Sequence, residues 1–147
     1  MSALLARLQQ ELIGARKARE ADRTLLLSTI VSDIKAREID LTRPLADDDA
    51  LEVVRKGIKK RRESVEAYRA GGRDELAAKE AAEVAILEAY LPPQANPDDI
   101  RAAAREAIVA GATNLGAVMG KVMARFKGIA DGAVISQIVR EELAKQG

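Results

Sequence analysis

Residues 53–80 read VVRKGIKKRRESVEAYRAGGRDELAAKE, and this stretch decides the fold of the N-terminal part of the chain. Its apolar residues, with one preceding leucine, recur at helical spacing along one stripe: Leu51, Val54, Ile58, Val65 and Tyr68. Gly71-Gly72 ends that helix, because glycine adopts the left-handed conformation of a helix C-terminus without strain. Another helix is expected over residues 73–90, so the stretch predicts a helical hairpin.

The composition of the 147-residue chain favours helices throughout. Hydrophobic residues make up 48% of the sequence, which is enough for a buried core, whereas aromatic residues make up only 2%. The core must therefore be built from leucine, isoleucine, valine and alanine. Abundant alanine and leucine together with 32% charged residues is typical of helical proteins. No segment shows the alternation of a β-strand, so we predict an all-α fold.

Prolines mark a domain boundary in the stretch LPPQANPDD, residues 91–99. Pro92, Pro93 and Pro97 lie close together, and a helix cannot continue through them. Asn96 is a good N-cap for a helix that has Pro97 in its first turn. We therefore predict two domains, residues 1–93 with about four helices and residues 94–147 with three short helices. The expected helices are residues 2–20, 22–39, 47–70, 73–90, 97–110, 115–125 and 132–145. Asp22 is expected to cap the second of these helices, and Leu76 is expected to face the core from the fourth.

The absence of cysteine and histidine restricts the chemistry that the chain can perform. It removes disulfides, thiolate nucleophiles, the usual zinc sites and any imidazole base. The serines and carboxylates show no spacing at which a base would activate a nucleophile. We therefore expect no catalytic residues, no cofactor-binding residues and no metal ligands. An enzyme with a carboxylate–lysine site that sequence patterns do not reveal stays open as a third alternative.

Two further absences bear on where the protein is expected to work. No apolar run approaches the roughly 18 residues of a membrane span, and the N-terminus lacks the apolar core of a signal peptide. We therefore expect a cytoplasmic monomer without membrane contact. The formal net charge is only +1, so global charge gives no reason to expect nucleic-acid binding. Any such site must come from a local cluster of basic residues.

The densest basic cluster holds six cations between Arg55 and Arg62. At about 100° per residue, four basic residues form one ridge beside the apolar stripe: Arg55, Lys59, Arg62 and Arg69. Several cations of the run also have an acidic residue four positions away, which stabilises a helix. The pattern leaves three alternatives open: a solvated helix face, a ridge that contacts nucleic-acid phosphates, or a contact with a partner protein.

A second candidate lies in the tail, where residues 119–143 read MGKVMARFKGIADGAVISQIVREEL and predict a helical hairpin. Its connector carries three cations near a glycine: Lys121, Arg125 and Lys127 around Gly128. An exposed glycine lets a sugar–phosphate backbone approach closely, although a plain hairpin with solubilising lysines fits the spacing equally well. The stretch GAVMG, residues 116–120, has small residues four apart and predicts close helix packing.

The sequence resembles the YqeY family, and the resemblance covers essentially the whole chain. The more specific block is RRESVEAYRAGGRDELAAKEAAEVAILEAYLPPQ, residues 61–94, and the tail motifs MGKVM, KGIADG and ISQIVREEL supply the second. The family is homologous to the C-terminal part of the B subunit of the tRNA-dependent amidotransferase. That enzyme converts glutamate or aspartate, mischarged on tRNA, to the amide. The resemblance implies a helical N-terminal domain and a three-helix tail.

The resemblance also implies a function. In the amidotransferase the helical and tail parts hold the tRNA elbow, and the same domain assists tRNA binding in some glutaminyl-tRNA synthetases. We therefore expect a tRNA-binding accessory protein. By position, the expected tail contacts are Gly120, Lys121, Lys127, Gly128 and Asp131. The label of carbon–nitrogen ligase with glutamine as amido donor describes the family complex, because this chain has no counterpart of the amidase subunit or the ATP-using cradle domain.

The chain departs from the family at Ile129, where many relatives have a basic residue directly after the lysine–glycine pair. Its tail hairpin is also shorter than that of many stand-alone relatives. Both departures bear on the expected contact between the tail turn and RNA. The alternative function is a docking module that binds an amidotransferase or an aminoacyl-tRNA synthetase through its apolar and charged faces.

Overall fold

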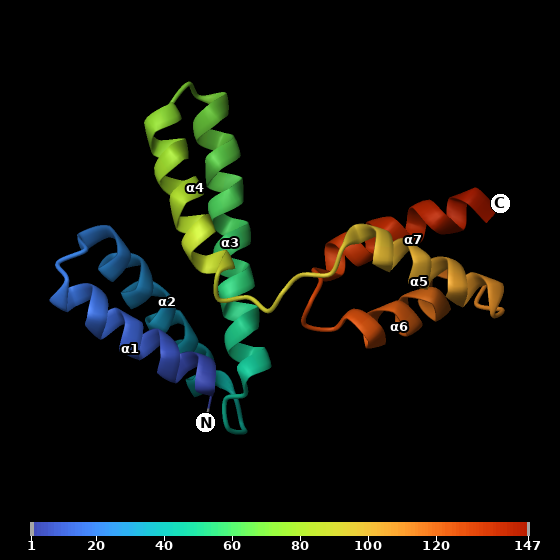
Figure 1. Ribbon diagram of the computed structural model, residues 1–147, viewed down its shortest axis with the longest axis horizontal. Coiled ribbons are helices and arrows are strands. Elements are labelled where there is room, and N and C mark those ends of the chain that lie inside the picture. The colour runs from blue at the N-terminus through green and yellow to red at the C-terminus, as the bar shows by residue number, and fades with distance from the viewer. Residues whose placement is uncertain (1, 147) are drawn as a thin grey trace. The chain divides into compact units, whose positions relative to one another are not determined.

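A computed structural model describes residues 2–146, and this part of the chain forms seven α-helices and no strand (Figure 1). The all-α prediction is therefore confirmed. Met1 and Gly147, the outer limits of the two predicted domains, lie outside the described residues. The helices are α1 Ala3–Lys17, α2 Ala21–Asp40, α3 Asp47–Ala70, α4 Asp74–Glu88, α5 Pro97–Val109, α6 Leu115–Phe126 and α7 Gly132–Gln146.

Three local predictions need correction. The first helix ends at Lys17 rather than near residue 20. Asp22, expected as an N-cap, lies in the first turn of α2, where Glu20 holds the cap position. Leu76, expected in the core, is exposed, because the buried face of α4 begins one residue later at Ala77. In each case the apolar periodicity predicted the helix but did not decide how its end meets the neighbouring elements.

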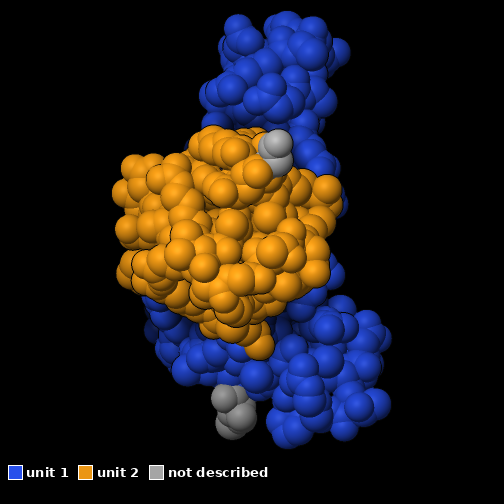
Figure 2. All heavy atoms as spheres, turned by 90° about the vertical axis from the view of Figure 1, so that its right-hand side faces the viewer, with its two compact units in different colours: residues 1–91 blue, residues 92–147 orange. Residues whose placement is uncertain are grey.

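The chain divides into two compact units, Met1–Leu91 and Pro92–Gly147, which we call unit 1 and unit 2 (Figure 2). Unit 1 consists of two helical hairpins, α1–α2 and α3–α4, and both α1 and α2 pack against α3. The hairpins diverge from the region where they meet (Figure 1). The core of unit 1 is mainly aliphatic and includes Leu8, Leu27, Ile30, Ile34, Val54 and Leu87.

Glycine packing differs from the expectation. Gly116 and Gly120 do not mediate close helix contact: both are exposed, and a Cβ added at Gly120 would meet no atom within 4 Å. The predicted close packing at GAVMG is therefore wrong. The glycine that permits close packing is Gly57 in α3, where a Cβ would lie 3.0 Å from Ile30 Cδ1 and 3.6 Å from Leu87 Cδ1.

Carboxylates in the first turn of α3 join it to other segments. Asp47 accepts a hydrogen bond from the Ser2 hydroxyl at 2.6 Å and another from the Leu4 amide at 3.0 Å, which links α3 to the start of α1. These bonds lower the pKa of Asp47, the Ser2 bond most. Asp49 accepts two hydrogen bonds from Arg43, at 2.7 and 2.8 Å. The carboxylates of this first turn thus interact favourably with the positive end of the helix dipole and stabilise the α2–α3 connection.

Unit 2 is a three-helix bundle in which α5, α6 and α7 all contact one another. Its core includes Ile100, Ala104, Val118, Val122, Ile135 and Val139. Asn96 caps α5, because its side chain accepts a hydrogen bond from the Asp98 amide at 2.9 Å. The Ala95 amide donates to the Ile129 carbonyl at 2.7 Å, which fastens the proline segment to the α6–α7 turn.

Candidate nucleic-acid interface

Helix α3 carries all four residues of the predicted ridge, which we define as Arg55, Lys59, Arg62 and Arg69. Lys59 is exposed, and no carboxylate oxygen of residues 2–146 lies within 4.0 Å of its ammonium group. Arg55 is half-buried. Lys59 is therefore the ridge residue whose charge is most available to a ligand.

The other two ridge residues already contact carboxylates. Arg62 forms an ion pair with Glu88, which connects α3 to α4. Arg69 pairs with Glu66 at 3.6 Å, and both of these side chains are largely exposed. The ridge therefore combines one accessible cation, Lys59, with one that bridges to α4 and one that pairs within α3, and part of the basic run is the solvated face of a helix.

The remaining cations of the run face a different part of unit 1. Lys56, Lys60 and Arg61 line a cleft of about 530 Å³ between α2, α3 and α4. Arg61 is largely buried; it pairs with Glu83 at 3.2 Å and donates to the Gly57 carbonyl at 3.0 Å. The guanidinium of Arg61 thus fixes the spacing of α3 and α4 rather than facing solvent.

The alternative of an enzyme with a carboxylate–lysine site requires lysines close to carboxylates, and the cleft brings such residues together. Its acidic residues are Asp33, Asp40, Glu80 and Glu83, and its basic residues are Arg37, Lys56, Lys60 and Arg61. Burial, followed by the charge of Glu83, raises the pKa of Glu80. Ser64 also lines the cleft, but its hydroxyl donates to the Lys60 carbonyl at 3.1 Å. The cleft thus holds four acidic and four basic side chains, and within residues 2–146 the Ser64 hydroxyl has no hydrogen bond to a lysine or a carboxylate side chain.

The second predicted site, Gly120, Lys121, Lys127 and Gly128, lies on α6 and the turn after it, and we call it the tail surface. Both lysines are exposed, and no carboxylate oxygen of residues 2–146 lies within 4.0 Å of either ammonium group. Gly128 has a φ of +83°, a conformation that favours glycine. Arg125, between the lysines, pairs with exposed Glu106 at 3.3 Å. The tail surface therefore presents two uncompensated cations beside two glycines at which an added Cβ would meet no atom within 4 Å.

Asp131, which was carried over from the family, and Ile129, where the chain departs from the family, both serve the fold. Asp131 caps α7, since its carboxylate accepts a hydrogen bond from the Ala133 amide at 2.9 Å. Ile129, where many relatives are expected to have a basic residue, packs partly buried against the core of unit 2. Its carbonyl accepts the bond from Ala95. The cations of the turn are thus those of the lysines and of Arg125.

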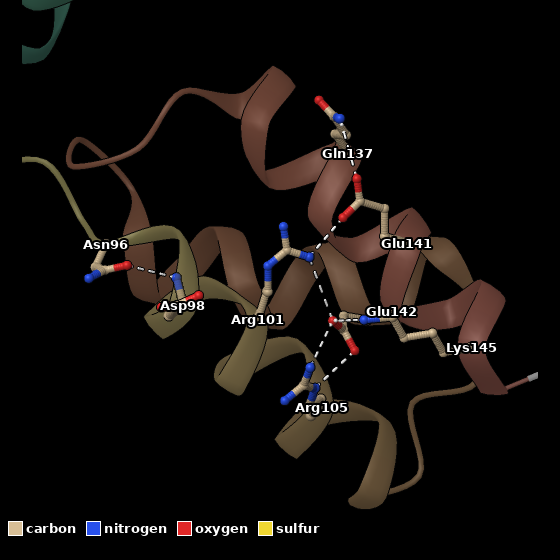
Figure 3. Close-up of polar contacts among 8 residues, drawn as sticks. All are labelled: Asn96, Asp98, Arg101, Arg105, Gln137, Glu141, Glu142 and Lys145. Atoms are coloured by element: carbon tan, nitrogen blue, oxygen red, sulfur yellow. Dashed lines mark hydrogen bonds and ion pairs between the residues drawn. The ribbon is translucent and has the colours of Figure 1, made fainter.

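Sequence reasoning missed a buried charged cluster in unit 2 (Figure 3). Glu142 of α7 is only 1% exposed. It accepts hydrogen bonds from Arg105 at 3.0 and 3.3 Å and from Lys145 at 3.2 Å, and Arg101 lies 3.8 Å away. A signal was present, because Glu142 continues the helical spacing of the buried Ile138 and Val139.

The arginines of this cluster set the ionisation of the acids that they contact. The hydrogen bond from Arg105 is the largest influence that lowers the pKa of Glu142, and Lys145 acts in the same direction. Arg101 donates to Glu141 at 2.7 Å and lowers its pKa. Glu142 therefore stays ionised inside the bundle and joins α5 to α7. Within residues 2–146 no group of three or more acidic residues could hold a metal ion.

The fold consists of two helical hairpins followed by a three-helix bundle, and basic residues lie on a long helix and on a tail turn. These features define a class of small all-α proteins. The chain belongs to the YqeY family, because the family model described as Yqey-like protein matches residues 5–143.

Fungal relatives agree with this membership. An uncharacterized protein of Schizosaccharomyces pombe is 31% identical over 63% of this chain and 76% of its own length. A protein of Pyrenophora tritici-repentis named altered inheritance of mitochondria protein 41, mitochondrial, is 29% identical over 94% of this chain and 80% of its own length. A protein of the same name from Eremothecium gossypii is 32% identical over 68% of this chain and 56% of its own length.

These names correct the expected location. The predicted cytoplasmic assignment is wrong, since two of the relatives are named as mitochondrial proteins. The prediction rested on a missing signal-peptide core and a missing membrane span, and neither feature distinguishes the cytoplasm from an organelle. No helix within residues 2–146 is long and apolar enough to cross a membrane.

Proposed function

We propose that this chain is a tRNA-binding accessory protein without catalysis of its own, and that the tail surface is its main contact. The observation that carries the proposal is the pair Lys121 and Lys127, both exposed and uncompensated beside the glycines 120 and 128. Such cations can neutralise phosphates without first breaking an internal ion pair. Adjacent glycines leave room for the sugar–phosphate backbone.

Gly120 supports this assignment independently of charge. A glycine inside a helix costs about 1 kcal/mol relative to alanine. Packing does not explain its presence, since no atom lies within 4 Å of an added Cβ. A close approach by a ligand would explain why a side chain is absent next to Lys121.

The ridge contributes less in this proposal. Lys59 offers an uncompensated charge, whereas Arg62 and Arg69 would share theirs with Glu88 and Glu66. The near-zero net charge also argues for few contacts and weak binding. The choice of tRNA over other nucleic acids rests on the resemblance to the amidotransferase B subunit, not on the charge pattern.

The test is fluorescence anisotropy with labelled total tRNA across a salt series. Each neutralised phosphate contributes a slope of about 0.7–0.9 in log affinity against log salt. Three or four contacts should therefore weaken binding roughly 20- to 150-fold between about 50 and 200 mM salt. Replacing both Lys121 and Lys127 by glutamate should weaken tRNA binding. It should also reduce the slope of log affinity against log salt by the contribution of about two phosphate contacts.

The control variant is Arg140→Glu, an exposed reversal on α7 that changes charge in the same unit. Lys145 is unsuitable as a control, because it bonds to the buried Glu142. The proposal fails if the parent does not bind tRNA at low salt, or if the lysine variant binds like Arg140→Glu. Docking to an amidotransferase or synthetase would then be the better account.

A further inference from the structure

A groove runs along the solvent side of the α1–α2 hairpin, and the tRNA proposal does not use it. It consists of two neighbouring hollows of about 480 and 440 Å³ whose linings both include Arg16 and Ser28. Its α2 wall presents small side chains at helical spacing: Ala21, Ser28 and Ser32. Small residues keep the surface hollow and let another helix approach closely. We call this feature the α1–α2 groove.

The charge of the α1–α2 groove has one sign. Its cations are Arg16, Arg19 and Lys35, and no aspartate or glutamate lines either hollow. No carboxylate oxygen of residues 2–146 lies within 4.0 Å of these three side chains. Glu20, the adjacent acid in the sequence, pairs with Arg23 at 3.9 Å. The groove therefore differs from the cleft around Lys60, whose cations face carboxylates.

Arg19 occupies a position that the backbone would reserve for glycine. Its φ is +56°, and the Glu20 amide donates to the Ala15 carbonyl at 3.0 Å, as in a Schellman C-terminus. Helices α3 and α5 end in the same way with Gly72 and Gly111, at φ +72° and +109°. A residue with a Cβ is strained in this conformation. Backbone geometry thus opposes an arginine, whereas a role for its charge at the end of the groove would explain it.

The groove exposes two apolar side chains and contains one polar atom without a hydrogen-bond partner among residues 2–146. Leu25 is 64% exposed and Ile13 is 44% exposed, one on each helix. The Thr24 hydroxyl oxygen is buried and has no hydrogen-bond partner among residues 2–146. By contrast, the Thr29 hydroxyl donates to the Leu25 carbonyl at 3.0 Å, as helical threonines commonly do.

We propose that the α1–α2 groove docks an acidic amphipathic helix of a partner protein. Apolar side chains of that helix cover Leu25 and Ile13, and its carboxylates meet Arg16, Arg19 and Lys35. This follows the helix-in-groove mode of recognition, in which an apolar stripe fills a hollow between flanking polar contacts. Along α2 the lining runs from Ala21 to Lys35, about 21 Å at 1.5 Å per residue, or roughly four turns of the bound helix.

Charge complementarity selects an acidic occupant, and the apolar residues select protein over nucleic acid. A phosphate backbone would satisfy the three cations but would leave Leu25 and Ile13 in water. A second copy of this chain, a nucleic acid and a basic or neutral protein segment are the competing occupants. Each of them would form a different covalent product with a probe placed in the groove.

The experiment places the photo-crosslinker p-benzoylphenylalanine at Leu25 in the full chain, expressed in cells of its source organism. The matched control has the same probe at Ile39, which is exposed at the other end of α2 and lines neither hollow. The expected product is a Leu25-specific adduct whose partner peptide, identified by mass spectrometry, is acidic and has apolar residues at helical spacing. A synthetic peptide of that segment should then bind the parent chain.

Arg19→Gly separates binding from folding. It relieves the left-handed strain, so Tm should rise, while the affinity for the identified peptide should fall about tenfold. Arg16→Glu should lower the affinity for the peptide further. The proposal is overturned by an adduct to nucleic acid, to a second copy, or to a segment without net negative charge. It is also overturned if Leu25 gives no adduct beyond the Ile39 control, or if Arg19→Gly binds the peptide like the parent.

Discussion

Replacing Glu142 by glutamine tests how strongly the buried charged cluster stabilises unit 2. The substitution keeps the volume of the side chain but removes its charge inside the bundle, where it is 1% exposed. It also replaces one acceptor oxygen by a donor nitrogen that faces the N–H groups of Arg105 or Lys145. The cations themselves reach solvent, so they keep partial hydration in the variant.

The expected magnitude follows from the three hydrogen bonds that Glu142 accepts. A hydrogen bond to a charged group contributes about 1.5–3 kcal/mol, against about 0.5–1.5 kcal/mol for a neutral one. Losing the charge should thus remove about 3 kcal/mol, and relief of the desolvation of the carboxylate offsets part of that. We expect a net loss of about 1–3 kcal/mol. A unit of this size has a free energy of unfolding of roughly 3–8 kcal/mol, so the loss is large.

The effect should depend on pH in one direction. The pKa of Glu142 is lowered in the folded state, chiefly by Arg105, from an unfolded value of about 4.3. A lowered folded pKa adds stability above the unfolded value, and that stability disappears as pH falls through the folded pKa. The difference in the free energy of unfolding between the parent and Glu142→Gln should therefore have its full size at pH 7. It should shrink below about pH 4.3, because the parent becomes protonated.

The assay is hydrogen exchange of unit 2 peptides in increasing urea, followed by mass spectrometry. Intrinsic fluorescence would not report on unit 2, because Tyr68 and Tyr90 lie in unit 1 and tryptophan is absent. The control is Glu106→Gln, whose partner Arg125 is on the surface and whose own side chain is 71% exposed; it should change stability by less than about 1 kcal/mol. Two outcomes would refute the reasoning. One is equal stability of Glu142→Gln and Glu106→Gln, and the other is a stability difference between the parent and Glu142→Gln that is as large at pH 3 as at pH 7.

Three other predictions test separate features. Subtilisin should cut within residues 92–96 before it cuts within α4, because no helix crosses the prolines; earlier cleavage in α4, seen by mass spectrometry, would count against separable domains. Gly120→Ala should raise the stability of α6 by about 0.5–1 kcal/mol and weaken tRNA binding, and unchanged tRNA affinity would exclude a close approach there. The purified chain should form no amide from mischarged tRNA, ATP and glutamine; turnover that copurifies with it would contradict this expectation.

Helix existence was predictable from the sequence because it depends on local spacing. The stripe through Val54, Ile58 and Val65 is buried as expected, and Gly72 ends α3, the long helix of the α3–α4 hairpin, with positive φ. The prolines after Leu91 predicted an interruption, and α4 and α5 are separate helices there. Capping and periodicity act over a few residues, so a short continuous stretch of the sequence contains the information.

The partners of charged side chains could not be predicted in the same way. Arg55 to Arg62 look alike in the sequence, yet Arg61 packs beside Glu83 and Arg62 pairs with Glu88, both from α4. Lys59 lies between them in the sequence and has no carboxylate within 4.0 Å among residues 2–146. Which cation is neutralised depends on residues more than twenty positions away, and helical spacing does not encode that distance.

Glycine and buried charge show the same division between local and tertiary information. Gly120 matched a packing motif and is exposed, whereas Gly57 matched none and lies against Ile30. Glu142 continues an apolar stripe, and its burial is stable only because α5 brings Arg105 against it. The sequence by itself determined the helices and the proline interruption, since these depend on neighbours along the chain. Tertiary structure decided which side chains are buried together and which charges stay accessible, because those depend on how the helices pack.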